Sequence, residues 1–385
     1  MTTSSPSTRP TGSRINLVLI VVFIGLLWLP LLDTVFHLDS APAVNENREA
    51  APKPIFTGWS ETKEFFQGSE RYYDDHFGFR KRLVRWHSGW KEKAFHEAAV
   101  RDVIIGRDGW LYTATNEMIE NYTRIKQFSA EDLDAWQKLF ETRRDWLAQR
   151  GIQYLVVFTP DKQTIYPEHL PDWLKRGTAP SKLDQIMQRL NERSSVAVLD
   201  IRPTLLEAKQ HEPVYLMTDT HWNQRGIFAS YQALITKLSA QVSGLTTPLP
   251  ATFFTWQNSP LPGDLAIMLG QESSFPEGNR VSFSPKEPLQ IEETSLPSAK
   301  RVAMTTTRNP KATGKAIVYH DSFGHGWIPL IGYHFGEVIY IAKRPIDPAL
   351  IEREKPIIVI DQIVERILSV KDPRVIMSDD GLTKP

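Results

Sequence analysis

Cysteine is absent from the 385 residues of this chain. Its absence excludes disulfide bonds, a thiol nucleophile and thiolate metal ligands, and leaves the redox compartment undecided. An excess of one charge is also lacking, since 45 lysine and arginine residues balance 45 aspartate and glutamate residues. This balance gives no argument for a nucleic-acid partner. No internal repeat is visible, and the length suits one large domain or two modest ones.

A long apolar run near the amino terminus predicts a membrane-spanning helix. Residues 15–32 are nearly all apolar, and with 34–36 the run approaches the roughly 20 residues that such a helix needs. Two arginines precede the run and two aspartates follow it, which predicts a cytoplasmic amino terminus with the rest of the chain outside. A cleaved signal peptide is the alternative, with Ala41-Pro42-Ala43 as a possible cleavage site. That site lies far beyond a long apolar run, so we favour a retained anchor.

The remaining chain alternates between strand-like and helix-like segments, which predicts an α/β fold. The alternation indicates a largely parallel sheet flanked by helices. Residues 242–312 break this rhythm, and we interpret them as an irregular insertion that forms one wall of a cleft. We expect a hairpin at 103–112, strands at 152–158, 196–200, 316–319, 338–341 and 356–360, and helices at 61–66, 83–99, 130–150, 181–192, 223–238 and 362–368.

Ser322 follows the strand expected at 316–319 and precedes a glycine-rich turn. A hydroxyl at the carboxyl end of a buried strand lies where open α/β sheets expose reactive groups. The backbone N–H groups of Ser322, Phe323 and Gly324 would suit an oxyanion, since Gly324 allows close approach. A turn serine without chemistry is the alternative. As a nucleophile, Ser322 would need a base.

His221 is our candidate for that base, because Asp219 precedes it by two residues and one loop can present both. A neighbouring aspartate fixes the tautomer of a catalytic histidine and stabilises its cationic form. Thr218 or Asn223 would cap the helix that follows, which leaves Asp219 and His221 for other work.

Two alternatives to this assignment stay open. His320 or His325 could replace His221 as the base, although neither has an obvious orienting carboxylate. Histidine and aspartate also bind metals, but no pair of histidines shows the i,i+4 spacing of a helical metalloprotease motif. We therefore expect neither a metal nor another cofactor.

Two further stretches contain candidate functional residues. Lys162 follows the strand expected at 152–158, where its ammonium group could face a carboxylate-bearing or acylated substrate; a solvated surface lysine is the alternative. Gly263-Asp264-Leu265 is similar to the Gly-Asp-Ser of serine esterases, but leucine stands where the nucleophile belongs. We therefore assign no catalytic role to this second stretch.

Taken in order, the motifs resemble those of the AlgJ/AlgX family of alginate O-acetyltransferases, whose catalytic domain is SGNH-hydrolase-like. Asp-Thr-His-Trp at 219–222 is the most specific of them. The resemblance implies that Asp219 orients the base, His221 acts as base and then acid, and Ser322 is the nucleophile. Lys162 and Gly324 are tentative substrate-binding residues. The stretches that carry the likeness are 45–48, 75–80, 103–112, 160–162, 165–168, 219–223, 263–265 and 321–324.

The resemblance implies an enzyme that O-acetylates an exported polysaccharide, anchored in the inner membrane with its catalytic domain in the periplasm. It also implies that a membrane-bound acyltransferase supplies the acetyl donor. A carbohydrate acetyl-esterase with the same triad and a non-catalytic polysaccharide-binding or assembly subunit are the alternatives. We accordingly expect a cytoplasmic tail (1–14), a transmembrane signal-anchor (15–36), a linker (37–58), an SGNH-like catalytic domain (59–372) and a tail (373–385).

Overall fold

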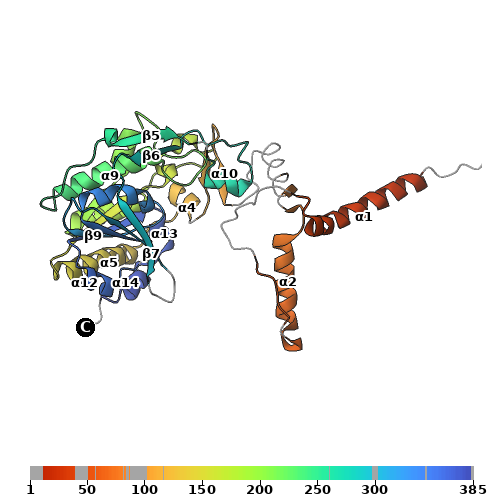
Figure 1. Ribbon diagram of the computed structural model, residues 1–385, viewed down its shortest axis with the longest axis horizontal. Helices are drawn as coiled ribbons and strands as arrows, with labels where there is room; N and C mark the ends of the chain where they lie inside the picture. The colour runs from red at the N-terminus through yellow and green to blue at the C-terminus, as the bar shows by residue number, and fades with distance from the viewer. Residues whose placement is uncertain are drawn as a thin grey trace, which may run out of the picture. The chain divides into compact units, whose positions relative to one another are not determined.

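The computed structural model describes residues 12–39, 51–56, 58–80, 82–83, 86, 102–115, 117–259, 261–296, 302–342 and 345–382. Most of the helix predicted at 83–99 lies outside these residues. The chain divides into two compact units, which are described separately (Figure 1). One unit comprises residues 1–100 with 267–271, and the other comprises 101–266 with 272–385.

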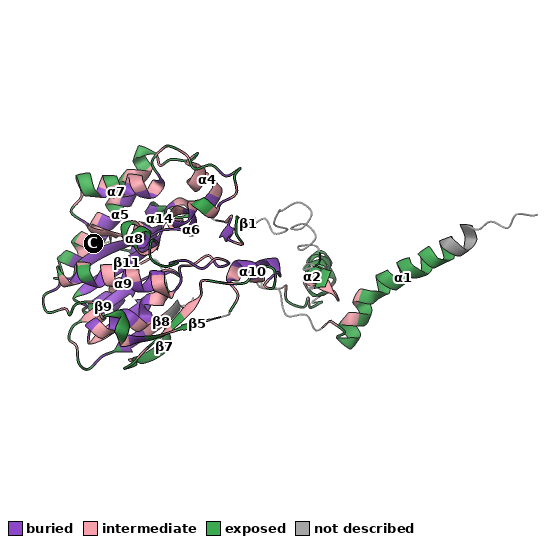
Figure 2. Cartoon of the chain, turned by 90° about the horizontal axis from the view of Figure 1, so that it is seen from above, coloured by how far each residue is buried: buried purple, intermediate pink, exposed green. Residues whose placement is uncertain are grey.

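The described residues of the first unit include the helices α1 (Gly12–Phe36) and α2 (Thr62–His76), with the 3₁₀ turn η1 (Trp59–Glu61) before α2. The apolar side chains of α1 are exposed along the helix (Figure 2). Its segment Asn16–Phe36 is long and apolar enough to cross a membrane. The apolar run therefore forms the predicted helix, which fits a single-pass anchor or a signal sequence.

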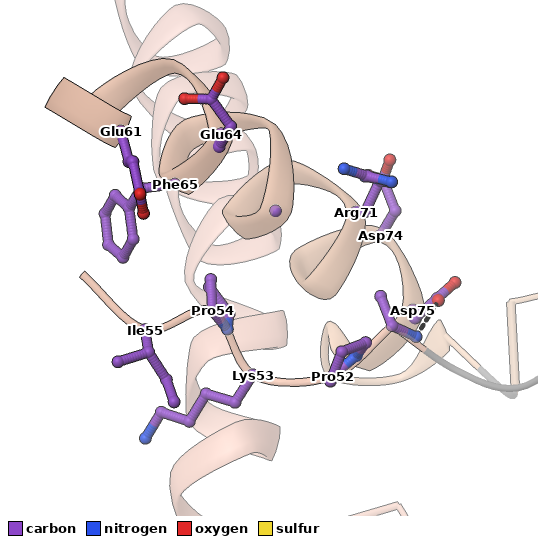
Figure 3. A pocket seen from close by; sticks show the side chains of 12 residues that line it. Pro52, Lys53, Pro54, Ile55, Glu61, Glu64, Phe65, Arg71, Asp74 and Asp75 are labelled. Atoms are coloured by element: carbon purple, nitrogen blue, oxygen red, sulfur yellow. Dashed lines mark hydrogen bonds between the residues drawn. The ribbon is translucent and has the colours of Figure 1, made fainter. Parts of the chain in front are cut away.

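A groove of about 650 Å³ lies between α2 and the segment 51–55 of the first unit (Figure 3). The Asp75 carboxylate closes one end by accepting a hydrogen bond from the Ala51 N–H group at 2.8 Å. Phe65 and Ile55 supply apolar walls. The groove belongs wholly to the first unit, and the residues that line it include none of the sequence-predicted catalytic groups.

The second unit is built on a seven-stranded sheet with the order β4-β3-β11-β9-β10-β8-β7. The five strands from β4 to β10 pair in parallel, and β8 and β7 extend the sheet in antiparallel fashion. The predicted α/β class with a largely parallel sheet is confirmed. The strands are β3 (Gln153–Thr159), β4 (Ala197–Asp200), β7 (Gln290–Leu296), β8 (Val302–Arg308), β9 (Lys315–Tyr319), β10 (Glu337–Ile341) and β11 (Ile358–Val364).

Helices cover both faces of this sheet. Alternate side chains of the central strands pack on one face against α8 (Arg202–Ala208), α9 (Gln224–Ser239) and α11 (Ile328–Ile331). The intervening side chains pack on the other face against α5 (Ala130–Ala148), α7 (Lys182–Arg193), α12 (Pro348–Glu354) and α14 (Pro373–Asp380). Burial on both faces explains why the central strands are almost continuously apolar.

Shorter elements complete the second unit. Ser129 caps α5 and Ser181 caps α7, each in a capping box with the aspartate three residues later. The predicted hairpin is present as β1 (Val103–Ile105) and β2 (Leu111–Thr113). The others are α4 (Met118–Thr123), α6 (Lys162–Ile165), η2 (Pro167–His169), η3 (Ala251–Phe253), β5 (Phe254–Asn258), β6 (Val281–Pro285), η4 (Gly324–Trp327), η5 (Gly332–His334) and α13 (Ile367–Val370). The short helix α10 (Asp264–Leu269) begins in the second unit, and its residues from 267 onward are assigned to the first.

Three sequence-based predictions need correction. The helix predicted at 362–368 is wrong, because β11 continues to Val364 and only the short α13 follows. Residues 242–312 are not an irregular insertion throughout, since they contain the β5–β6 hairpin and supply β7 and β8 to the main sheet. Residues 373–385, predicted as a tail, begin with α14, whose Ile376 and Asp380 are buried.

Candidate functional site

A tight loop between α8 and α9 presents Asp219 and His221. A pair of residues, Tyr215 and Trp222, forms an antiparallel bridge that closes the loop, and the Leu216 N–H group donates to the His221 carbonyl at 3.2 Å. Asn223 caps α9 as predicted, accepting from the N–H groups of Arg225 and Gly226 at 3.0 Å. The helix therefore fixes the end of the loop without using the Asp219 or His221 side chains.

The structure brings the three predicted catalytic side chains together at the carboxyl edge of the sheet. The Ser322 Oγ atom lies 2.8 Å from His221 Nε2, and His221 Nδ1 lies 2.8 Å from Asp219 Oδ1. Ser322 is exposed, whereas Asp219 is buried. The expected separation of about 2.6–3.2 Å between hydroxyl and imidazole is thus confirmed. The three side chains thus form one hydrogen-bonded chain, which is the geometry that a serine–histidine–aspartate triad requires.

Asp219 has hydrogen-bond donors at both carboxylate oxygens. The Oδ1 atom also accepts from the His221 N–H group at 3.1 Å, while Oδ2 accepts from the Asp264 N–H group at 3.2 Å and from Arg280 Nη2 at 3.1 Å. Burial alone would raise the pKa of Asp219, but hydrogen bonds and the charge of His221 lower it below its ordinary value. Asp219 is therefore ionised at neutral pH and can support a positive charge on the imidazole ring.

Asp321 holds the turn that carries Ser322. Its Oδ1 atom accepts from the Phe323 N–H group at 2.9 Å, and its Oδ2 atom accepts from the Val364 N–H group of β11 at 2.8 Å. The Asp321 N–H group donates to Gln362 Oε1 at 3.0 Å. The Phe323 N–H group is therefore engaged, which corrects the expectation that it would serve an oxyanion. The Ser322 and Gly324 N–H groups keep that role as a prediction.

Gly324 is buried, and packing explains the need for glycine at this position. A Cβ atom on Gly324 would lie 2.5 Å from the Cβ atom of His320 and 2.9 Å from Gln362 Oε1. Contact between Gly324 and a substrate stays a prediction. Phe323 next to it is fully buried, with its ring centroid 5.1 Å from that of His221 and 5.3 Å from that of Trp222. The aromatic contact fixes the base and the nucleophile turn against each other.

Lys162 is not the substrate-facing cation that the sequence suggested. It is 2% exposed, and its Nζ atom donates to the carbonyl oxygens of Leu216, Met217 and Asp219 at 3.1, 3.0 and 2.7 Å. Burial lowers the pKa of Lys162 to about 7. The three carbonyl contacts match the three donors of an ammonium group. Lys162 thus stabilises the backbone of the loop that carries Asp219 and His221.

Three residues that the sequence reasoning missed, or set aside, also hold this loop. Glu277 accepts from the N–H groups of Met217 and Thr218 at 3.0 and 2.8 Å. Arg280 contacts Asp219 as described above. Asp264, dismissed because Leu265 replaces a nucleophile, accepts from the Thr220 N–H group at 2.8 Å and the Thr220 hydroxyl at 2.7 Å. The Gly-Asp pair was the one sequence signal that could have pointed to this contact.

The alternative bases and the metal hypothesis find less support in the geometry. His320 is buried with Nδ1 2.7 Å from the Asp321 carbonyl oxygen, and His325 is exposed. Among the described residues, Asp219, His221 and Asp264 could hold a cation, since their ligand atoms lie within 4.8 Å of one another. However, each carboxylate oxygen in this group already accepts from a protein donor, and His221 Nε2 faces Ser322.

The fold and the site together define a class of protein, the SGNH-hydrolase-like α/β proteins that carry a serine, a histidine and an aspartate at the carboxyl edge of the sheet. A family profile described as "SGNH hydrolase-like domain, acetyltransferase AlgX" matches residues 103–304, just over half of the chain. The chain belongs to this AlgX acetyltransferase family. The match ends before Ser322, so the position of that residue in the site follows from the geometry.

Curated relatives agree with this family, and a solved structure is similar in fold. The probable alginate O-acetylases AlgJ of Pseudomonas syringae and Pseudomonas aeruginosa are each 26% identical over 66% and 71% of this chain. The chain spans 60% and 61% of their lengths. The structure of Bacillus cereus PatB1 with a sulfonyl adduct has a TM-score of 0.53 and 14% identity, covering 71% of this chain and 99% of that one. That likeness concerns the fold alone.

Proposed function

We propose that this protein is a polysaccharide O-acetyltransferase that works through an acetyl-serine at Ser322. The observation that carries the proposal is the continuous hydrogen-bonded chain from Ser322 Oγ through His221 to Asp219. Membership of an acetyltransferase family supports the reaction, and relatives named alginate O-acetylases support a polysaccharide acceptor. An exposed hydroxyl on a half-buried base also suits a large acceptor, because both the donor and a polymer must reach Ser322.

The first half-reaction transfers the acetyl group to the enzyme. Ser322 Oγ attacks the acetyl carbonyl carbon while its proton passes to His221 Nε2. The developing oxyanion is stabilised by the Ser322 and Gly324 N–H groups. The bond between the acetyl carbon and the leaving group then breaks, and His221 returns the proton to that leaving group. The product is an acetyl ester on Ser322.

The second half-reaction releases the acetyl group to a sugar. A sugar hydroxyl gives its proton to His221 Nε2 as its oxygen attacks the ester carbonyl. When the tetrahedral intermediate collapses, Ser322 Oγ leaves and takes the proton back from His221. Throughout both steps Asp219 holds the Nδ1–H tautomer and offsets the positive charge of the imidazolium. A water molecule in place of the sugar would give the esterase reaction.

Direct trapping of the intermediate tests the proposal. The full-length protein is mixed with 4-nitrophenyl acetate, quenched in acid and digested, and the peptide that contains Ser322 is weighed by mass spectrometry. We expect this peptide to gain one acetyl group, and the label to disappear when oligosaccharides of uronic acids are added and acetylated. Labelling elsewhere but not on Ser322 would contradict the acyl-enzyme. Loss of label to water at the same rate with and without sugars would favour the esterase.

We further propose that α1 anchors the catalytic unit to the inner membrane, with that unit in the periplasm and a membrane-bound acyltransferase as the source of acetyl groups. The apolar length of α1 and the arginines before it support this orientation. A reporter enzyme that is active only outside the cytoplasm should be active when fused after Pro385, and inactive when fused after Arg14. Activity of a cytoplasm-dependent reporter after Pro385 would refute this topology.

The same fusion separates an anchor from a signal peptide. A retained anchor keeps the full-length chain in the membrane fraction. Cleavage near Ala41-Pro42-Ala43 would instead release a shorter chain, which mass spectrometry distinguishes.

A further inference from the structure

The side chain between Asp219 and His221 forms a second hydrogen-bonded path to the base. Thr220 Oγ1 lies 3.0 Å from His221 Nδ1, close to the 2.8 Å that separates this nitrogen from Asp219 Oδ1. The Thr220 hydroxyl donates its hydrogen to Asp264 Oδ2 at 2.7 Å. A hydroxyl has one hydrogen and two acceptor lone pairs, so its oxygen is left to accept from Nδ1–H. The Nδ1–H group of the His221 ring is thus shared between the Asp219 carboxylate and the Thr220 hydroxyl.

Asp264 sits at the end of this second path and fixes it from two directions. Both of its oxygens accept from Thr220, one from the backbone N–H group at 2.8 Å and one from the hydroxyl at 2.7 Å. Its own N–H group donates to Asp219 Oδ2 at 3.2 Å. The carboxylate lies 3.9 Å from His221 Nδ1, too far for a direct hydrogen bond. The Asp264 carboxylate can therefore act on His221 through Thr220 or through its charge.

Gly263 is what allows this approach. A Cβ atom on Gly263 would lie 2.2 Å from the carbonyl carbon and oxygen of Thr218 and 2.5 Å from the Asp219 nitrogen. A side chain there would push the two backbones apart and carry Asp264 away from the loop. Gly263 and Asp264 thus act together, because the glycine permits the close approach and the aspartate makes the contacts with Thr220.

We infer that Thr220 and Asp264 are positioning residues of the acyl-transfer reaction, forming a relay from His221 Nδ1 through the Thr220 hydroxyl to the Asp264 carboxylate. The inference rests on the proposed function and deepens it. When His221 takes the proton of Ser322, its ring becomes cationic and Nδ1–H becomes a stronger donor. The relay then strengthens along its whole length, because hydrogen bonds to charged groups are stronger than neutral ones. Asp219 and Asp264 together hold the ring with Nε2 aimed at Ser322.

Isosteric substitutions separate the relay from simple packing. Thr220→Val keeps the shape and removes the hydroxyl, and Thr220→Ser keeps the hydroxyl and removes a methyl group. Asp264→Asn keeps the shape and loses one of its two bonds, because an amide offers a donor where the carboxylate accepts. Thr236→Val is the matched control, since Thr236 is exposed on α9 and its hydroxyl donates to the Gln232 carbonyl oxygen of its own helix.

The rate of acetylation of Ser322 by 4-nitrophenyl acetate is measured on the full-length variants. We expect Thr220→Val and Asp264→Asn to slow this step about 10- to 100-fold, the loss typical of a hydrogen bond to a charged group. The concentration of ester that gives the half-maximal rate should not change, since neither side chain is expected to contact the acetyl donor. Thr220→Ser should stay within about threefold of the parent, and Thr236→Val should match it. The double variant should be no slower than the slower single variant, because both remove the same path.

A second probe keeps this result separate from the proposed function. Phenylmethylsulfonyl fluoride reacts with a base-activated serine without any acetyl chemistry, and the mass of the Ser322 peptide reports its rate. If the parent forms the sulfonyl ester but no acetyl ester, the proposed function fails and the sulfonylation rates still decide the relay. Parent rates in Thr220→Val with either probe would overturn the relay. Equal losses in Thr220→Ser and Thr220→Val, or additive losses in the double variant, would also overturn it.

Discussion

Ser322→Ala is expected to lower acetyl transfer roughly 10⁴- to 10⁶-fold, to the level set by binding and the oxyanion donors alone. Without Oγ no acetyl ester can form at this position. Among the described residues, Ser322 supplies the hydroxyl that is hydrogen-bonded to His221 Nε2, and no second hydroxyl shares that contact. The change removes one exposed oxygen and should leave folding intact. Transfer to oligosaccharide is measured by mass spectrometry, with Ser239→Ala, a surface serine on α9, as the control.

The partners of Ser322 should show losses of similar size. His221→Ala removes the base and should come close to the loss in Ser322→Ala. Asp219→Asn should lower the rate by about 10⁴-fold, because an amide cannot hold the Nδ1–H tautomer or balance the imidazolium charge. Transfer at the parent rate by folded Ser322→Ala protein would show that the nucleophile is another group, and direct transfer to the sugar would then become the better mechanism.

Arg143→Met is expected to lower the free energy of unfolding by about 3–5 kcal/mol, the usual cost of removing one partner of a buried ion pair. Arg143 is fully buried on α5. Its Nε and Nη2 atoms donate to the two oxygens of Asp380 at 2.8 Å, and Nη1 donates to Asp361 at 2.5 Å. Burial opposes the positive charge of Arg143, but Asp361, Tyr154 and Asp380 together outweigh it and keep the pKa of Arg143 above its ordinary value. The substitution would leave two buried carboxylates without this cation.

The neighbouring arginine provides the control for this loss. Arg144 lies next to Arg143 on α5, but its partner Asp145 is exposed, and surface ion pairs contribute about 0–1 kcal/mol. Urea unfolding of Arg143→Met and Arg144→Met, followed by tryptophan fluorescence, gives the two losses under the same conditions. A loss in Arg143→Met no larger than that in Arg144→Met would show that the buried cluster does not stabilise the fold.

The buried apolar strands and the amphipathic helices could be predicted from the sequence because their signals are local. The strand at 152–158 and the helix that Ser129 caps needed no knowledge of their partners. The end of β11 could not be predicted in this way. Asp361 and Gln362 are polar residues inside a fully buried strand, and they are tolerated because Arg143 and Thr159, more than 200 residues earlier, bind them. Their polarity made the segment resemble the start of a helix.

The antiparallel strands β7 and β8 were missed for a related reason. β7 is an edge strand with glutamate and threonine side chains, and the exposed Glu292 pairs with Arg308 across the two strands. Charged, polar sequences are typical of edges, where they discourage pairing with other chains. Such a segment lacks the apolar run that marks a central strand, so the sequence pattern was interpreted as irregular.

The candidate site divides in the same manner. Asp219 and His221 are two residues apart, and Ser322 precedes a glycine turn, so each half of the site carries a local signal. Lys162 was misassigned because its position after a strand does not reveal burial. Asp264 was dismissed because its role depends on a through-space contact with Thr220, 44 residues earlier in the chain.

The order of strands in the sheet has a consequence for how the chain folds. β11 lies between β3 and β9, although it is the last of the described strands in the sequence. The half of the sheet formed by β3 and β4 and the half that carries Ser322 are joined through β11. Closing such distant contacts is entropically costly, and sheets of this kind fold slowly. The Ser322 hydroxyl can therefore meet His221 in a stable way only after the final strand has inserted, which keeps an incomplete chain from presenting an activated serine.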